Sequence, residues 1–205
     1  MKKWVLTPDK FLKPEEATLL RNTLEDKALA AIAKNKKKPV RDWAMIDIAL
    51  SAGLRASEIT NLTIKDAHLG KGESALFVKN GKGHKNRLVL IGDKLKKHLK
   101  DYLSWKKQVG ETVDLASYLF VSERGPKLTL SAIQKRFKHG IRAAGLPSRY
   151  SIHSARHTYG TLLYRTTKDL RMVQKQLGHS SCQVTEVYAD VLSDDTQKAV
   201  NALYV

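Results

Sequence analysis

The sequence is poor in cysteine, in long apolar runs and in acidic residues, and each shortage excludes a class of protein. One cysteine, Cys182, among 205 residues excludes an internal disulfide framework and fits a reducing compartment. No stretch approaches the ~18 consecutive apolar residues that a membrane-spanning helix needs. Residues 1–3 are not followed by the apolar region of a secretory signal, so we expect a cytoplasmic protein with no membrane contact.

The shortage of acidic residues leaves a strong positive charge. Lys and Arg total 37 against 20 Asp and Glu, which gives a formal net charge of +17, and the excess is spread along the chain. Such a bias favours a polyanionic partner. Nucleic acid is preferred over an anionic membrane, because no long basic amphipathic segment with bulky apolar residues opposite is evident. Charge alone does not distinguish one nucleic acid from another.

The apolar pattern predicts a mainly helical protein with a small three-stranded antiparallel sheet. Three segments have strand character and are separated by Gly-rich turns: 62–69, 74–78 and 87–91. Helical periodicity and capping signals predict helices over 14–33, 40–52, 93–108, 129–144, 151–164, 170–177, a segment starting at 180 or 181, and 194–203. Residues 118–121 form a short buried segment of open type. The basic run 35–39 is expected to be a loop, either solvated or in contact with phosphate.

The expected helix from residue 151 has an unusual polar face. At 100° per residue, one third of its circumference carries His153, Arg156, His157, Gly160 and Tyr164. Lys and Glu are the usual residues where a helix faces water. Imidazoles, a guanidinium and a glycine that permits close approach to the backbone indicate a functional site instead.

These residue types suit nucleophilic attack on a phosphodiester. Arginines from two elements offer bidentate forks to phosphoryl oxygens, and imidazoles bind the same oxygens and move protons. A hairpin lysine can protonate a leaving oxygen, and a tyrosine can form a covalent phosphotyrosine. Nearby positive charge is expected to lower the pKa of that phenol. No carboxylate pair suggests itself, which disfavours a two-metal mechanism.

Each candidate residue also has a structural explanation. Arg55 follows an apolar helix and can be a helix-capping arginine, and Tyr188 lies on an apolar stripe and can be a core residue. Lys82 shares its turn with Lys79 and Lys85, and all three can be solvated at a hairpin tip. A zinc site is a further alternative, with ligands drawn from these positions: His153, His157, His179 and Cys182. The cationic Arg156 among them opposes a metal ion.

Five motifs together resemble the catalytic domain of tyrosine recombinases, the phage-type integrases. In chain order they are Gly53-Leu54-Arg55-Ala56-Ser57-Glu58, Gly81-Lys82-Gly83-His84-Lys85-Asn86-Arg87, His153-Ser154-Ala155-Arg156-His157-Thr158, Leu177-Gly178-His179-Ser180 and Tyr188. The order agrees with the family, as do the 23 positions from Arg156 to His179 and the nine from His179 to Tyr188. The resemblance covers residues 40–192 and implies one catalytic domain over 1–205.

The resemblance implies a metal-independent DNA strand transferase, without cofactors, that performs integration, excision or inversion. Arg55 and Arg156 would clamp the scissile phosphate, and Lys82 would protonate the departing 5′ oxygen. His153 would act in proton transfer, and His179 would bind a non-bridging oxygen. Tyr188 would attack and form a 3′-phosphotyrosyl link. Glu58 and His157 match supporting positions.

The family resemblance also concerns assembly, and rival functions stay open. Such recombinases usually carry a separate helical core-binding domain, whereas only about 40 residues precede the region of resemblance here, so we expect a short form. Double-stranded DNA is the expected partner, with a homo-tetramer on DNA and a monomer or weak oligomer alone. Residues 193–205 are expected to form a helix that docks on a neighbouring protomer or folds back on its own domain. Type IB topoisomerase-like relaxation and a non-catalytic DNA-binding role are the alternatives.

Overall fold

The computed structural model describes residues 6–79, 86–122, 125–179 and 183–190. Its helices and strands are, in chain order, η1 (Pro8–Lys10), α1 (Pro14–Ile32), α2 (Lys37–Ala52), α3 (Ala56–Asn61), η2 (Ile64–Asp66), β1 (Ala67–His68), β2 (Ala75–Val78), β3 (Arg87–Leu90), α4 (Asp93–Gln108), α5 (Leu130–Ala143), α6 (Ile152–Thr167), α7 (Leu170–Leu177) and α8 (Gln183–Asp190). The predicted mainly helical class with a small three-stranded antiparallel sheet is confirmed.

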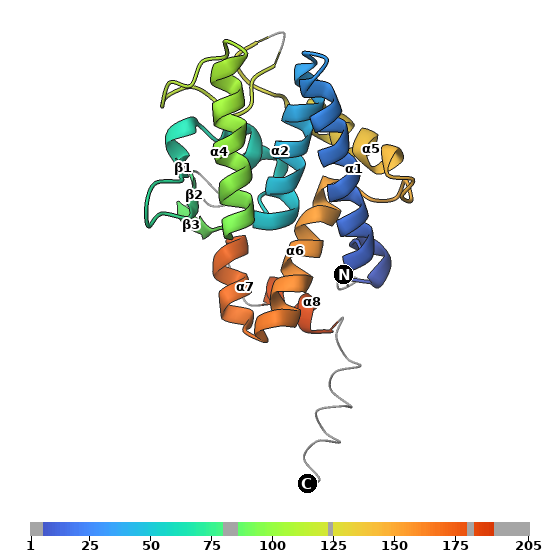
Figure 1. The fold of residues 1–205 in the computed structure, drawn as a ribbon. Helices are drawn as coiled ribbons and strands as arrows, with labels where there is room; N and C mark the ends of the chain where they lie inside the picture. Colours follow the sequence, from blue (N-terminus) through green and yellow to red (C-terminus); the bar gives the residue numbers. More distant parts are fainter. Residues whose placement is uncertain (1–5, 80–85, 123–124, 180–182, 191–205) are drawn as a thin grey trace, which may run out of the picture.

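Helix α2 is the centre of the domain. Its sequence is apolar nearly all round, and only a few of its residues reach solvent. Helices α1 and α4 pack on either side of it, and α5 and α6 also pack against it (Figure 1). The helix ends at Gly53, whose φ of 62° lies in the left-handed region that a residue without a Cβ adopts readily. The chain therefore turns sharply at the point where the first motif begins.

The sheet lies at one edge of the domain, in the order β1-β2-β3. Strand β2 pairs with β3 so that Val78 faces Arg87, and the β2 residues Ala75, Leu76 and Val78 are buried. The prediction of a strand over 62–69 is wrong for most of its length, because only Ala67–His68 pairs with β2.

A local polar cap replaces the predicted strand. The Asp66 carboxylate accepts hydrogen bonds from the main-chain N–H of Thr63 (3.0 Å) and from its hydroxyl (2.6 Å), which closes the 3-10 turn η2. Just before this turn, the Leu62 carbonyl accepts from the N–H of Leu119 at 2.8 Å. The segment 118–121, left open by the sequence, is thus partly an extended partner of 62–63.

One smaller difference from the prediction and one long-range contact concern the first helices. Helix α2 begins at Lys37, so the basic run 35–39 is partly helical, and Pro39 sits in the first turn, where its missing N–H leaves no bond unmade. The segment before α1 is tied to α6, because the Leu12 N–H donates to the buried Thr158 hydroxyl at 2.9 Å.

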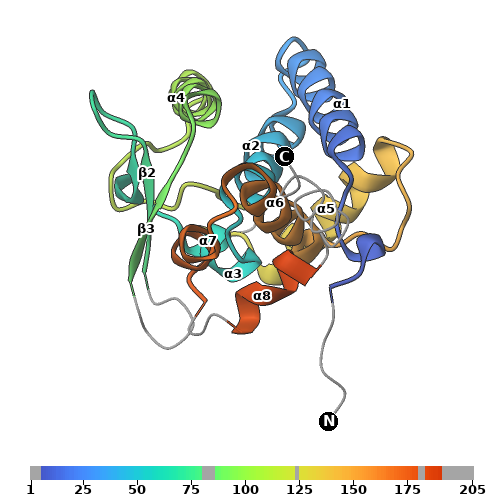
Figure 2. The same ribbon diagram turned by 90° about the horizontal axis from the view of Figure 1, so that it is seen from below.

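Helices α6, α7 and α8 form a layer at one end of α2. Figure 2 shows α8 crossing beneath α6, with α7 and α3 beside them. A small apolar cluster holds this layer together and is separate from the main core: Leu6, Val173, Leu177, Val187 and Tyr188. The predicted helix over 194–203 and the predicted helix start at 180 or 181 lie outside the described residues. Among the helices that are described, none has the length and apolarity needed to cross a bilayer.

Candidate active site

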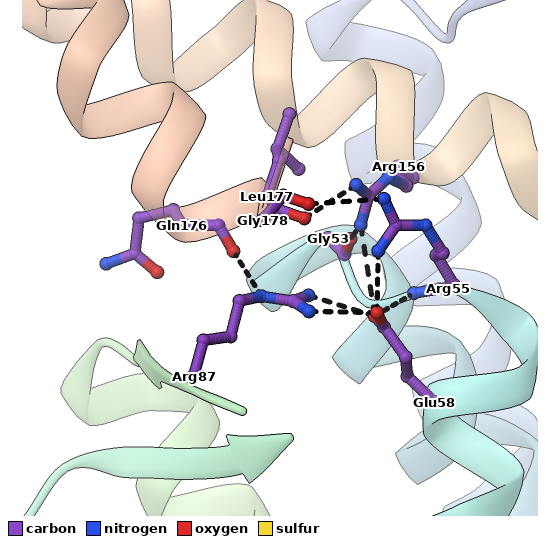
Figure 3. A network of polar contacts seen from close by, with 8 residues as sticks. All are labelled: Gly53, Arg55, Glu58, Arg87, Arg156, Gln176, Leu177 and Gly178. Carbon is purple, nitrogen blue, oxygen red and sulfur yellow. Dashed lines mark hydrogen bonds and ion pairs between the residues drawn. The ribbon is translucent and has the colours of Figure 1, made fainter. Parts of the chain in front are cut away.

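Glu58 is the hub of an arginine cluster at the junction of α2, α3, α7 and β3 (Figure 3). Its Oε1 accepts from Arg55 Nη1 at 2.7 Å and from Arg87 Nη1 at 2.8 Å. Its Oε2 accepts from the Arg55 main-chain N–H at 2.8 Å and from Arg87 Nη2 at 2.9 Å. Burial alone would raise the pKa of this carboxyl, but the hydrogen bonds and charge of Arg87, together with the hydrogen bonds from Arg55, outweigh it and lower the pKa to about 2.

Arg156 is buried and is held by the ends of two helices. Its Nη1 donates to the Gly53 carbonyl and its Nη2 to the Leu177 carbonyl, both at 2.7 Å. These carbonyls close α2 and α7, and the negative ends of both helix dipoles therefore face the guanidinium. Burial and the neighbouring Arg55 lower the pKa of Arg156 to about 10, which leaves it charged at neutral pH.

Arg55 is the more accessible arginine of the pair. It is the N-cap residue of α3, and its side chain is 23% exposed. Its Nη2 makes only a long contact of 3.4 Å with the Gly178 carbonyl. Arg55, Arg87 and Arg156 together carry three positive charges, and Glu58 carries one negative charge, so the cluster has a net charge of +2. Such a cluster fits an anionic ligand with several oxygens.

Tyr188 packs next to this cluster, with only 1% of its surface exposed. Its ring lies against Gly160 of α6, where an added Cβ would come within 2.6 Å of the Tyr188 Cζ. Gly160 was expected to permit close approach to the backbone, and the group that approaches is the phenol. Tyr188 belongs to the small apolar cluster, as the core interpretation required, yet its hydroxyl lies 3.3 Å from His157 Nδ1.

The expected lowering of the phenol pKa is wrong for this conformation. Burial raises the pKa of Tyr188 to about 12, although Arg156 and Arg55 both act to lower it. The positive charge is present as predicted from the sequence, but removal of water around the ring outweighs it. The phenol is therefore protonated at neutral pH.

The two imidazoles beside Tyr188 are neutral at pH 7. Burial and the charge of Arg156 lower the pKa of His157 to about 4 and that of His179 to about 3. The His179 ring is parallel to the phenol within 6°, with a centroid separation of 6.3 Å, and its Nδ1 lies 3.0 Å from Thr185 Oγ1. Both rings thus contact the tyrosine.

The zinc interpretation gains no support from this geometry. In the part of the chain that the structure describes, no three side chains of His, Cys, Asp or Glu lie close enough to share a metal ion. Cys182, one proposed ligand, lies outside the described residues. The imidazoles of His157 and His179 are directed to Tyr188 and Thr185 instead.

The structure brings together four of the six residues predicted for the site: Arg55, Arg156, His179 and Tyr188. His153 lies in the first turn of α6 and is exposed. Lys82 lies outside the described residues. Arg87 ends the second sequence motif, and the sequence alone assigned it no role. The signal that could have identified it is the arginine at the end of that motif.

Comparison with known proteins decides the family. The family model described as phage integrase family matches residues 18–194. The chain belongs to this family. Tyrosine recombinase XerD from Oceanobacillus iheyensis is 35% identical over 164 residues, which cover 80% of this chain and 54% of the relative.

Solved structures of the phage integrase family confirm the fold. The crystal structure of XerA recombinase matches with a TM-score of 0.74 at 28% identity, over 92% of this chain and 64% of that one. The structure of XerH site-specific recombinase bound to difH substrate matches with a TM-score of 0.71 at 30% identity, over 92% of this chain and 52% of that one. The matched region spans about half the length of the XerD relative.

Proposed function

We propose that this chain cuts and rejoins strands of double-stranded DNA through a 3′-phosphotyrosyl intermediate on Tyr188, as a site-specific recombinase. One observation carries the proposal. The Tyr188 hydroxyl lies 3.3 Å from Nδ1 of His157, and His157 directly follows Arg156, one of the arginines gathered around Glu58. A nucleophile, a proton acceptor and a cationic cluster thus meet at one place.

In the proposed mechanism, Arg55 and Arg156 bind the non-bridging oxygens of the scissile phosphate. The net charge of +2 counters the extra negative charge that develops in the pentavalent transition state. Arg156 is fixed by two helix ends before the DNA arrives, so little reorganisation is needed. With Nδ1 of His179 engaged by Thr185, its Nε2 is the nitrogen that we assign to a phosphate oxygen.

The proton transfers follow from the protonation states. Tyr188 Oη attacks phosphorus, and its proton passes to Nδ1 of His157, which is neutral because its pKa is about 4. The bond to the 5′ oxygen breaks, and we assign protonation of that oxygen to Lys82. His153, exposed on the first turn of α6, is proposed to assist proton transfer at the phosphate. Attack by a 5′-hydroxyl on the phosphotyrosine reverses these steps and rejoins a strand.

The partner and assembly are proposed from charge and from the relatives. The net charge of +17 favours a polyanion, and the structure of the similar XerH recombinase is described as bound to difH substrate. Recombination needs cleavage of more than one strand, so we propose a homo-tetramer on DNA and a monomer or weak oligomer without it. Residues 193–205 are the segment that we propose to take part in assembly.

A search for covalent adducts tests this function. Wild-type protein is incubated with a pool of nicked duplexes of random sequence, and strands that stay linked to protein in SDS are recovered and sequenced. We expect adducts for the wild type and none for Tyr188→Phe, with Tyr118→Phe, in which a tyrosine remote from the site is changed, as the matched control. Binding to the pool without adducts, or adducts that persist in Tyr188→Phe, would contradict the proposal.

A further inference from the structure

We propose that Arg87 is a positioning residue that neutralises Glu58, so that Arg55 and Arg156 keep their full charge for the phosphate. The inference rests on the proposed function and adds a residue to it. Arg87 is the first residue of β3 and comes 29 positions after Glu58 in the chain, yet its guanidinium reaches the centre of the cluster (Figure 3).

The contacts of Arg87 direct three of its five N–H donors to Glu58 and to the main chain. Its two Nη atoms form a parallel fork on the two oxygens of Glu58, at 2.8 and 2.9 Å. Its Nε donates to the Gln176 carbonyl at 3.2 Å, and its side chain is only 12% exposed. Arg55 differs, because it is more exposed and its Nη2 holds only a long contact. With its fork on Glu58 and its Nε on the Gln176 carbonyl, Arg87 is assigned a role that acts on the phosphate through its neighbours.

A count of charges shows what this fork contributes. With Arg87 present, the cluster carries +2. Without Arg87, Arg55 and Arg156 alone must balance Glu58, and the net charge falls to +1. Arg55 Nη1 already donates to Glu58 at 2.7 Å, and Arg156 Nη1 lies 3.9 Å away. Both would then be drawn more strongly to the carboxylate and away from a phosphate, since charge interactions are strong in a site with little water.

Arg87 also supports the end of α7. A Cβ added at Gly178 would come within 2.7 Å of Arg87 Cδ and 2.8 Å of its Nε. The side chain of Arg87 thus lies directly on the backbone that presents the Leu177 carbonyl to Arg156 and the Gly178 carbonyl to Arg55. One side chain therefore contacts both the carboxylate and the helix end that fix the two phosphate-binding arginines.

The test compares variants on a duplex recovered with wild-type protein from the random pool. Single-turnover adduct formation is measured at saturating protein, and DNA affinity is measured separately. Arg87→Met should slow adduct formation by on the order of tenfold to a hundredfold, with DNA affinity changed by no more than about threefold. The matched control is Arg136→Met, since Arg136 is equally exposed (12%) and pairs with buried Asp42 at 2.7 Å away from the cluster.

A double variant separates charge from structure. Glu58→Gln combined with Arg87→Met restores the count to +2, so we expect it to form adduct faster than Arg87→Met alone. A purely structural role predicts that the double variant is as slow or slower. Arg87→Lys keeps the charge but cannot form the fork, and should give a rate between the wild type and Arg87→Met.

The outcomes divide the hypotheses. If folded Arg87→Met forms adduct at the wild-type rate, or the double variant gains nothing over it, the role of Arg87 is overturned while the proposed function stands. If Arg87→Met does not fold, Arg87→Lys decides, and a wild-type rate for that variant overturns the inference. If wild-type protein binds DNA and forms no adduct, the proposed function itself fails.

Discussion

Gly160→Ala offers a sharp test of the contact between α6 and Tyr188. Ala stabilises a helix interior by about 1 kcal/mol relative to Gly, so this change should ordinarily help α6. Here the new Cβ would lie 2.6 Å from Tyr188 Cζ, 2.8 Å from its Cε1 and 3.0 Å from its Oη. The tyrosine must move, because carbon atoms in contact sit ~3.5–4.0 Å apart.

The two effects on stability oppose each other. Overpacking a buried site costs about 1–3 kcal/mol, so after the helix gain the net destabilisation should fall between about zero and about 2 kcal/mol. The effect on cleavage should be larger. A displacement of the nucleophile by about 1 Å can slow a reaction on the order of a hundredfold.

The assay measures urea unfolding and single-turnover adduct formation for the same variants. In a Tyr188→Ala background the clash disappears, and Gly160→Ala should then stabilise the domain by about 1 kcal/mol. Gly140→Ala in α5 is the matched control, because its Cβ would meet Ile46 and Leu24 side chains at 3.3 Å and does not contact Tyr188. Wild-type cleavage in Gly160→Ala, or equal effects on stability in both backgrounds, would refute the reasoning.

Three further predictions concern buried polar groups. Because the folded pKa of Glu58 is about 2 against an ordinary 4.5, its contribution to the free energy of unfolding is complete above pH 4.5 and is lost as pH falls toward 2. The difference in the free energy of unfolding between wild type and Glu58→Gln should therefore shrink by about 3 kcal/mol over that range. The lowered pKa values of His157 and His179, about 4 and about 3, predict that NMR will find both imidazoles neutral at about pH 6, and a cationic ring at either position would contradict the burial argument. Thr158→Val removes the acceptor of the Leu12 N–H and should cost about 1–3 kcal/mol in chemical unfolding, whereas an unchanged stability would show that another acceptor replaces it.

Local signals in the sequence were sufficient to predict most of the helices that the structure describes. The expected helix over 93–108 and α4 have the same bounds, and Gly178 ends α7 in the left-handed conformation that its position suggested. Helical periodicity and caps depend on residues within a few positions of one another, so they can be read without the fold. The strand predicted over 62–69 failed because the Thr63–Asp66 cap and the pairing of Leu62 with Leu119 compete with the sheet.

The sequence by itself determined which chemical groups the site contains and the family to which the chain belongs. Five motifs in order were enough to indicate two arginines, imidazoles and a tyrosine, and the family match agrees. Only the tertiary structure decided how those groups act on one another. The fork of Arg87 on Glu58 and the two helix ends around Arg156 join residues that are 21 to 103 positions apart.

The protonation state of Tyr188 was also decided by the fold. The positive charges expected near Tyr188 predict a lowered pKa for its phenol. Burial against Gly160 raises the pKa to about 12 instead, because desolvation depends on how completely neighbouring elements exclude water. Charge can be counted along a chain, but the removal of water from a side chain exists only once the helices have packed.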